Sequence, residues 1–300
     1  MSKNIMEQAT NKLNIVGKLL DCTFGEGTTK TGQHYERANF TVRVTQKING
    51  VEETSEIPIS IFASQFTSQN KPHPGYKNIQ DMKKWKSVQD VGEAEATVVR
   101  MTNAQVQENN FVSKNGQLIN GWQIRTSFVN EAGKVADIAS FNVDIFIMDM
   151  HDEIDRDDEP TGRLIVKGAI VQYGGKLDVV EFIVEGNDAV DYISRNWNIN
   201  DTVNAGGRIR FTSQEVKRSA VESSWGEELP ETSTRMVREL IITRGSDEAF
   251  DEEFAYDPVD IKKAFNERKA MIEQLQIDAK KGANASEKPA GNRKYKSWEE

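Results

Sequence analysis

The sequence contains one cysteine, Cys22, and three histidines, His34, His73 and His151, which show no paired spacing. A single cysteine excludes an internal disulfide and any zinc site built from several cysteines. No apolar run approaches the roughly 18 residues of a membrane span. The first residues, MSKNIMEQATNK, hold no apolar stretch of signal-peptide type. We therefore expect a soluble protein of the cytoplasm.

Signatures of catalysis are also missing. The sequence has neither a Gly-x-x-x-x-Gly-Lys-Ser/Thr phosphate loop nor a Gly-x-Ser-x-Gly nucleophile elbow, and Gly25-Glu26-Gly27 is too short to indicate a nucleotide site. We predict that the chain is not an enzyme and that it carries neither a cofactor nor a metal ion.

The formal net charge of −9 is unevenly distributed. Residues 1–140 hold 16 Lys and Arg against 14 Asp and Glu, whereas residues 141–245 hold 12 against 20 and residues 246–300 hold 10 against 13. The local potential of a groove decides affinity for a polyanion, so the acidic total does not exclude nucleic-acid binding. It argues against a positive charge spread over the whole surface.

Alternating apolar residues predict strands in the first 130 residues. Apolar and polar residues alternate over 13–19 and 36–45, with a turn indicated by Phe24-Gly25-Glu26-Gly27. Asn49-Gly50 indicates a hairpin that leads to a third strand at 57–61. After Pro72 and Pro74 a short helix is expected at 79–85, and strands resume at 93–101 and 121–129.

The same order of elements repeats in the second half. Strands are expected at 141–150, 163–173 and 176–185, a helix at 188–197, and strands at 208–212 and 235–244. Trp85 and Val91 recur as Trp197 and Val203 at an offset of 112. Five strands with a helix between the third and fourth are the order of an OB fold. The sequence therefore predicts a mainly β protein with two tandem OB-type five-stranded barrels, a C-terminal helix and a disordered tail.

The expected organisation has five parts. They are a flexible N-terminus (1–11), a first barrel (12–136), a second barrel (137–246), a C-terminal helical segment (247–279) and a disordered tail (280–300).

Three stretches of the first barrel carry a resemblance. They are NIVGKL at 14–19, TKTG at 29–32 leading to ANFTV at 38–42, and ETSEIPISIF at 53–62. They resemble the bacterial single-stranded DNA-binding protein family, which has one barrel per chain and an Asp-rich tip ending in Pro-Phe. Two barrels and a tip of Trp298-Glu299-Glu300 make this chain look more like a bacteriophage version. The resemblance implies cooperative coating of single-stranded DNA during replication or recombination.

A sequence-tolerant binder of single strands needs aromatic platforms between cations, each stacked base contributing roughly 1–3 kcal/mol. Arg37 and Arg43 project opposite the core face of the second strand, and Lys30 and Tyr35 precede them. The fifth strand adds Trp122 and Arg125 on opposite faces, so that one of the two joins the groove. The alternative interpretation is that the aromatic residues pack in the core or at its rim and the arginines are solvated charges.

The second barrel offers a smaller set of candidates. Arg208 and Arg210 share a face, and Lys217 and Arg218 begin a loop that carries Trp225. We predict that these residues bind DNA, with the loop as a clamp. The alternative is a disordered surface loop, because four glutamates surround the tryptophan. Trp85 and Trp197 are predicted to be core residues under each barrel.

Two further segments have charged patterns. The acidic run 149–159 lacks the glycine and the final glutamate of an EF-hand, so a solvated linker is favoured over a Mg²⁺ or Ca²⁺ site. At the end of the chain, Trp298 lies beside Glu299, Glu300 and the terminal carboxylate. We predict that this tip binds replication or recombination proteins, although Lys and Arg residues just before it leave a DNA-binding arm as the alternative.

The leading hypothesis is therefore a sequence-independent single-stranded DNA-binding protein. The first alternative is an OB-type protein-interaction scaffold of a replisome or virion, and the second is a metal-dependent nuclease. A homo-oligomer or a cooperative array on DNA is compatible with the leading hypothesis.

Overall fold

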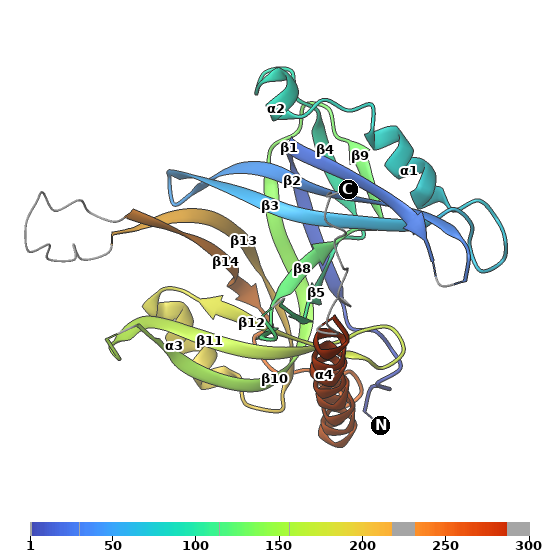
Figure 1. Cartoon of the computed structure of the whole chain (residues 1–300). Helices are drawn as coiled ribbons and strands as arrows, with labels where there is room; N and C mark the ends of the chain where they lie inside the picture. The colour runs from blue at the N-terminus through green and yellow to red at the C-terminus, as the bar shows by residue number, and fades with distance from the viewer. Residues whose placement is uncertain (1, 30, 114, 156, 218–231, 287–300) are drawn as a thin grey trace, which may run out of the picture.

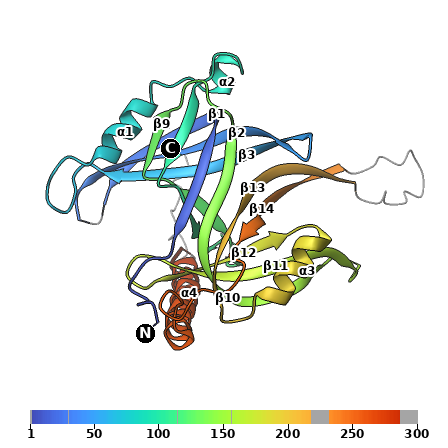
Figure 2. The same ribbon diagram turned by 180° about the vertical axis from the view of Figure 1, so that it is seen from behind.

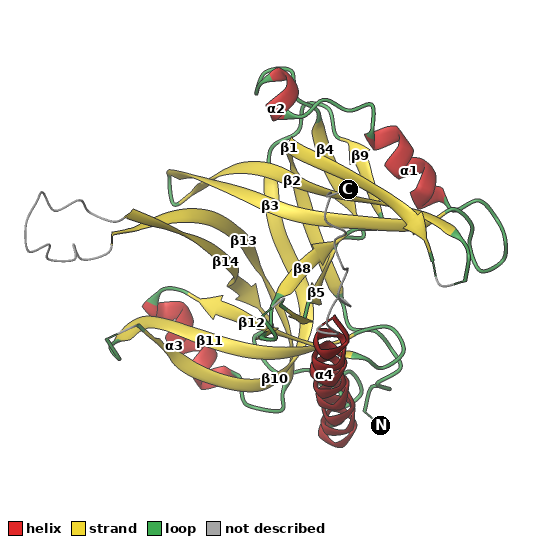
Figure 3. Cartoon of the chain, in the orientation of Figure 1, coloured by secondary structure: helices red, strands yellow, loops and turns green. Residues whose placement is uncertain are grey.

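The computed structural model describes residues 2–29, 31–113, 115–155, 157–217 and 232–286 (Figure 1). Most of the described residues lie in strands, and 12 of these strands form one hydrogen-bonded sheet (Figure 3). This sheet closes on itself twice, which leaves two barrels joined through a shared strand pair.

Five strand paths make the first barrel. They are β1 (Asn11–Thr28), β2 (His34–Ile48), β3 (Val51–Ser64), β4 (Val98–Thr102) continued by β5 (Gln105–Glu108), and β8 (Trp122–Arg125) continued by β9 (Phe128–Glu131). β1 pairs with β2, β2 with β3, β3 in parallel with β8, β8 with β5, and β4 with both β9 and β1, which closes the barrel. Helices α1 (Pro74–Met82) and α2 (Val88–Val91) lie between β3 and β4. A hairpin of β6 (Phe111–Val112) and β7 (Leu118–Ile119) lies between β5 and β8.

The second barrel repeats this order. Its elements are β10 (Ile138–Ile154), β11 (Pro160–Val171), β12 (Leu177–Val184), α3 (Asn187–Asn196), β13 (Thr202–Lys217) and β14 (Thr232–Gly245). The parallel pairing of β12 with β14 closes this barrel, as the pairing of β3 with β8 does in the first. The predicted fold class is therefore confirmed: both barrels have five strand paths, with a helix between the third and the fourth.

The two barrels are joined by strand pairing and by a common core. β1 pairs with β10 in an antiparallel ladder from Asn11↔Val143 to Val16↔Ile138. Buried apolar residues of both barrels form one continuous cluster. Within the second barrel, the ring centroids of Phe141 and Phe182 lie 5.6 Å apart in this cluster. Burial of this apolar surface is the main driving force for folding.

The N-terminal residues and helix α4 (Pro258–Ser286) lie side by side on the second barrel (Figures 1 and 2). Ile261 and Ala264 of α4 are buried against the core. The segment before β1, which we expected to be flexible, makes defined hydrogen bonds: the Ala9 N–H donates to the Val171 carbonyl at 2.8 Å, and the Tyr256 hydroxyl donates to the Glu7 carbonyl at 2.7 Å. In the described part of the chain, no helix has the length and apolar composition needed to cross a membrane.

Several predicted boundaries are wrong. Residues 24–27, expected as a turn, continue β1 to Thr28, and α1 lies at Pro74–Met82 rather than at 79–85. The acidic run 149–159, expected as a linker, forms the end of β10 and its turn into β11. α4 continues past its expected end at residue 279, because the Lys and Ala residues there have high helix propensity.

The two tryptophans expected in the core differ in burial. Trp197 follows α3, is fully buried, and donates its indole N–H to the Ser246 carbonyl at 3.0 Å. Trp85 follows α1 and is only partly buried against the same core. The repeated pattern thus marks the same topological place in each barrel, and only the second tryptophan is a complete core residue.

Candidate nucleic-acid interface

The outer face of β2, β3 and β8 carries most of the side chains that the sequence predicts in the first barrel. Buried residues alternate with outward ones along β2 and β3. We call the outward set the front face: Tyr35, Arg37, Asn39, Thr41, Pro58, Ser60, Phe62 and Arg125. The ladder places Arg37 opposite Phe62, and Ser60 beside both Asn39 and Arg125. Strands 2 and 3 of OB folds present the surface that binds oligonucleotides.

An aromatic pair stands at one end of the front face. The rings of Tyr35 and Phe62 lie 4.9 Å apart between centroids with an angle of 39° between their planes, and half of Phe62 is exposed. Phe62 was not predicted as a site residue. The alternation of β3 contains the signal, since Ile57, Ile59 and Ile61 are buried and Phe62 must therefore face outward.

Two glycines of β1 make room for this end of the front face. Gly25 pairs with Arg37 and Gly27 with Tyr35. A Cβ atom on Gly27 would lie 2.6 Å from the Tyr35 hydroxyl oxygen, and one on Gly25 would lie 2.9 Å from Arg37 Nε. The two side chains therefore lie flat across β1, in positions that any larger residue at 25 or 27 would obstruct.

Arg37 and Arg125 supply positive charge beside the aromatic pair. Both side chains are exposed, and in the described ranges neither guanidinium pairs with a carboxylate. Arg43, on the same face of β2, differs: its guanidinium contacts Glu56 at 2.8 Å and also Glu93. Hydrogen bonds from Lys18 and then Arg43 hold the pKa of Glu93 below its usual value, so the Glu93 carboxylate is ionised near neutral pH. Arg43 remains a predicted DNA ligand, but its charge is already compensated.

The front face leads into a groove of about 400 Å³. We call it the first-barrel groove. Asn39, Thr41, Pro58 and Ser60 line one part of it, and Trp122, Phe211 and Arg238 line the other. Trp122 lies edge-on to Phe211 with ring centroids 5.2 Å apart, and the Arg238 guanidinium lies 6.0 Å from the centroid of the Phe211 ring. Tyr35, Arg37 and Arg125 thus lie on the front face, while Trp122, on the opposite side of β8 from Arg125, lines the far part of the adjoining groove.

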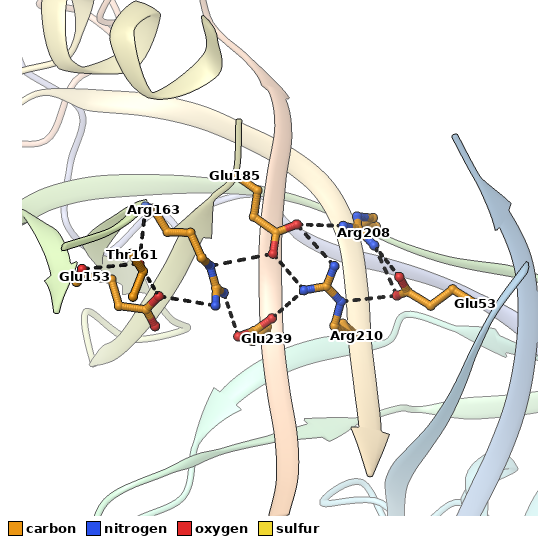
Figure 4. Close-up of polar contacts among 8 residues, drawn as sticks. All are labelled: Glu53, Glu153, Thr161, Arg163, Glu185, Arg208, Arg210 and Glu239. Atoms are coloured by element: carbon orange, nitrogen blue, oxygen red, sulfur yellow. Dashed lines mark hydrogen bonds and ion pairs between the residues drawn. The ribbon is translucent and has the colours of Figure 1, made fainter. Parts of the chain in front are cut away.

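Three arginines and four glutamates at the junction of the barrels form an ion-pair network (Figure 4). Its members are Glu53, Glu153, Arg163, Glu185, Arg208, Arg210 and Glu239. Arg210 is central, with contacts to Glu185 at 2.7 Å, to Glu239 at 2.9 Å and to Glu53 at 3.3 Å. Glu53 belongs to β3 of the first barrel, so the network links the barrels.

The network gives Arg208 and Arg210 a role other than the predicted one. The sequence predicts both as DNA ligands, whereas the structure engages both guanidinium groups with carboxylates. Burial alone would raise the pKa of Glu185, but the hydrogen bond and charge of Arg210, together with the charges of Arg208 and Arg163, outweigh it and lower that pKa. These arginines therefore link the barrels in the structure, and their contact with DNA stays a prediction.

The other predicted site residues lie outside the part of the chain whose side chains the structure describes. Lys30, Arg218, Trp225, Trp298, Glu299 and Glu300 are outside the described residues, and for Lys217 only the backbone of β13 is described. Their predicted roles in the clamp and in partner binding stay predictions.

A second groove, of about 540 Å³, lies over the outer surface of β11 and β12. We call it the second-barrel groove. Lys167, Arg235, Arg238 and Arg268 line it together with Ile165 and Val179. At its α4 end, Arg268 pairs with Glu108 of β5, its Nε lying 2.7 Å from a Glu108 carboxylate oxygen. Asp178 of β12 lies close to this pair and accepts a hydrogen bond from Gln172 at 2.9 Å.

Asp178 makes the stability of this region depend on pH. Burial raises the pKa of its carboxyl to about 6, and the charge of Glu108 also raises it. The folded chain therefore holds this proton more tightly than the unfolded chain. Its contribution to stability is complete at low pH and is lost as the pH rises from about 4 to about 6.

Replacing Asp178 by Asn should remove this dependence. Asp178→Asn removes the buried negative charge and keeps an acceptor for Gln172. The free energy of unfolding at pH 7.5 should therefore rise by up to about 3 kcal/mol, with little change at pH 4, where the wild-type carboxyl is protonated. Urea denaturation between pH 4 and 7.5 measures both values. Asp152→Asn, at an exposed position of β10, is the control. Parallel profiles for wild type and Asp178→Asn would contradict the assignment.

The architecture and the front face define a two-barrel OB-fold protein. Comparison with known proteins agrees on the fold: the wild-type single-stranded DNA binding protein from Thermus aquaticus is similar with a TM-score of 0.50 and 8% identity, over 82% of this chain and 96% of that chain. A deletion mutant of that protein has a TM-score of 0.49 and 11% identity, over 84% of this chain and 98% of the other. No curated protein matches the sequence.

The model of the YorF family matches residues 9–278. The chain therefore belongs to the YorF family. The match runs from the residues just before β1 into α4, so it spans both barrels and the two grooves.

Proposed function

We propose that this protein binds single-stranded DNA without sequence preference, with the front face and the first-barrel groove as the primary site. The observation that carries the proposal is the Tyr35–Phe62 ring pair flanked by Arg37 and Arg125 on the outer surface of an OB barrel. Bases stack on exposed rings and phosphates attract guanidinium groups, and neither interaction requires a particular base.

Two further features support the proposal. The cations of the front face lie in the part of the chain with the most positive charge balance, because residues 1–140 hold more Lys and Arg than Asp and Glu. In addition, the T. aquaticus protein that shares the fold is itself described as a single-stranded DNA binding protein. The absence of catalytic motifs in the sequence leads us to propose a binding role rather than an enzymatic one.

In the cell, we propose that the protein coats and protects single strands during replication or recombination, in the cytoplasm and as part of a bacteriophage system. Recruitment of other replication proteins through Trp298, Glu299 and Glu300 belongs to the same proposal and rests on the sequence alone.

The charges of the front face provide a direct test. Arg37→Ala/Arg125→Ala should weaken binding of oligo(dT) and reduce the slope of log affinity against log salt by up to about two. Each arginine removed means one phosphate contact fewer, so about one counterion fewer is released from the DNA on binding. Fluorescence anisotropy at several salt concentrations measures both quantities.

The matched control replaces two exposed cations on other surfaces, Arg195→Ala/Lys269→Ala, and should leave affinity and slope close to wild type. An Arg37→Ala/Arg125→Ala protein that folds normally and keeps the wild-type slope would remove the front face from the binding site.

A further inference from the structure

We propose that the bound strand does not end at the first barrel but crosses to the second at Trp122 and Arg238, and then follows the second-barrel groove. This inference rests on the proposed function. It assigns to the second barrel a binding surface that does not include Arg208 and Arg210, two of the residues that the sequence predicts there.

The two grooves meet at two side chains. Trp122 and Arg238 line both the first-barrel groove and the second-barrel groove. Trp122 belongs to β8 of the first barrel and Arg238 to β14 of the second, so the meeting point lies at the boundary between the barrels. A strand that follows the front face past Ser60 reaches this point without leaving the surface.

The meeting point has the chemistry that a single strand requires. The partly exposed ring of Trp122 packs edge-on against the buried ring of Phe211, one ring from each barrel, and Arg238 lies over the ring of Phe211, so Trp122 is the ring that a base can reach. A base can stack on an aromatic ring while the guanidinium attracts the adjoining phosphate. At the other end of the track, the half-exposed ring of Phe62, its neighbour Tyr35 and the exposed Arg37 again place aromatic surface beside a cation.

Beyond the meeting point, the second-barrel groove is lined by four cations and four glutamates, and most of these glutamates are engaged by arginines. Three of its four glutamates are engaged by arginines: Glu108 by Arg268, Glu153 by Arg163, and Glu239 by Arg163 and Arg210. Glu181 is the fourth, and it lies opposite Lys167 in the β11–β12 ladder. Arg235 and Arg238 of β14 add two further cations along the groove.

The barrels are held in the relative position that this track needs. The Phe211 N–H of β13 donates to Ser55 Oγ of β3 at 3.2 Å in a buried position. Glu53, two residues earlier in β3, contacts Arg208 at 2.9 Å. These two contacts from β3 hold Phe211 and its strand against the first barrel. The Trp122–Phe211 pair is therefore already in place without a bound strand.

Oligonucleotide length separates a strand on one barrel from a strand on both. OB folds cover about 4–16 nucleotides each, so oligo(dT) of about 8 nucleotides should occupy the first-barrel groove and one of about 24 nucleotides should reach both. The quantity to measure is the ratio of the two affinities, obtained by fluorescence anisotropy at one salt concentration with the full-length protein.

Three variants test the path. Lys167→Gln/Arg235→Gln neutralises two cations of the second-barrel groove alone, and Arg238→Gln neutralises the crossing point. At about threefold per cation removed, the long-to-short ratio should fall about tenfold in the double variant, whereas Arg238→Gln should weaken the short and the long strand alike by about threefold, because Arg238 lines both grooves. The control Arg195→Gln/Lys269→Gln should keep the wild-type ratio.

Each other outcome is decisive. If the double variant keeps the wild-type ratio, the strand leaves the first barrel by another route. If the double variant weakens the short and the long strand by the same factor, Lys167 and Arg235 affect the first-barrel site and the crossing is wrong. A wild-type protein that binds neither length would instead overturn the proposed function itself.

Discussion

Replacing Tyr35 and Phe62 together by Ala is expected to lower the affinity for oligo(dT) by between about thirtyfold and about twenty-thousandfold. In the proposed site, the half-exposed ring of Phe62 and the partly exposed ring of Tyr35 form the stacking platform of the front face, and each stacked base contributes about 1–3 kcal/mol. Tyr35 lies across Gly27 and pairs with Phe62, so removal of either ring also exposes its neighbour. Each single variant should therefore show a smaller loss than the double one.

The salt dependence distinguishes this loss from a loss of charge. Neither side chain is a cation, so the slope of log affinity against log salt should stay at its wild-type value, in contrast to Arg37→Ala/Arg125→Ala. The matched control is Tyr192→Ala/Phe254→Ala, which removes two rings that are 45% and 58% exposed away from both grooves. Wild-type affinity in the Tyr35/Phe62 variant would contradict stacking at this face.

Replacing Arg210 by Met is expected to lower the free energy of unfolding by about 3 kcal/mol, because it leaves carboxylates at the barrel junction without their counter-charge. Arg210 contacts Glu53, Glu185 and Glu239, and its side chain is only 18% exposed. Chemical denaturation near pH 7 measures the loss. In a Glu185→Gln background the same replacement should cost less, and the double-mutant cycle gives the coupling between the two groups.

The same variant separates the two interpretations of Arg210. If Arg210 holds the barrels together, Arg210→Met should bind a short oligo(dT) within about twofold of wild type under conditions where it is fully folded, since a factor of two is only about 0.4 kcal/mol. A stable Arg210→Met protein that had lost DNA affinity would restore the DNA contact that the sequence predicts. Arg195→Met, which removes an exposed arginine of α3, is the control for both measurements.

The alternation of apolar residues was enough to predict both barrels. In β2 every second residue from Glu36 to Val44 is buried, and the same period in β3 buries Ile57, Ile59 and Ile61. Because side chains of a strand alternate between faces, this pattern also places Tyr35 and Arg37 outward. The helix between the third and fourth strands, followed by Trp85 or Trp197, completed the order in each half.

Ion pairing could not be predicted in the same way. Arg208 and Glu53 are 155 positions apart in the sequence, and Arg210 and Glu239 are 29 apart. Their encounter depends on how β13 lies against β3 and β14, which alternation within one strand does not specify. Two arginines on one face of a strand therefore looked like a DNA-binding surface until their carboxylate partners were located.

The turn at 24–27 was wrong for a related reason. Glycines favour turns, but Gly25 and Gly27 lie inside β1, where the side chains of Arg37 and Tyr35 cross the strand. A glycine that makes room for a side chain of the neighbouring strand has the same local sequence as one that makes a turn. Only the pairing of β1 with β2 distinguishes the two.

Titration of the full-length protein with labelled oligo(dT) at increasing salt tests the central claim most directly. The account predicts binding at low salt and a log affinity that falls linearly as log salt rises, because guanidinium groups of the front face replace condensed counterions on the phosphates. It also predicts that Arg37→Ala/Arg125→Ala makes this line less steep. A correctly folded protein that binds no oligo(dT) at low salt would contradict the account.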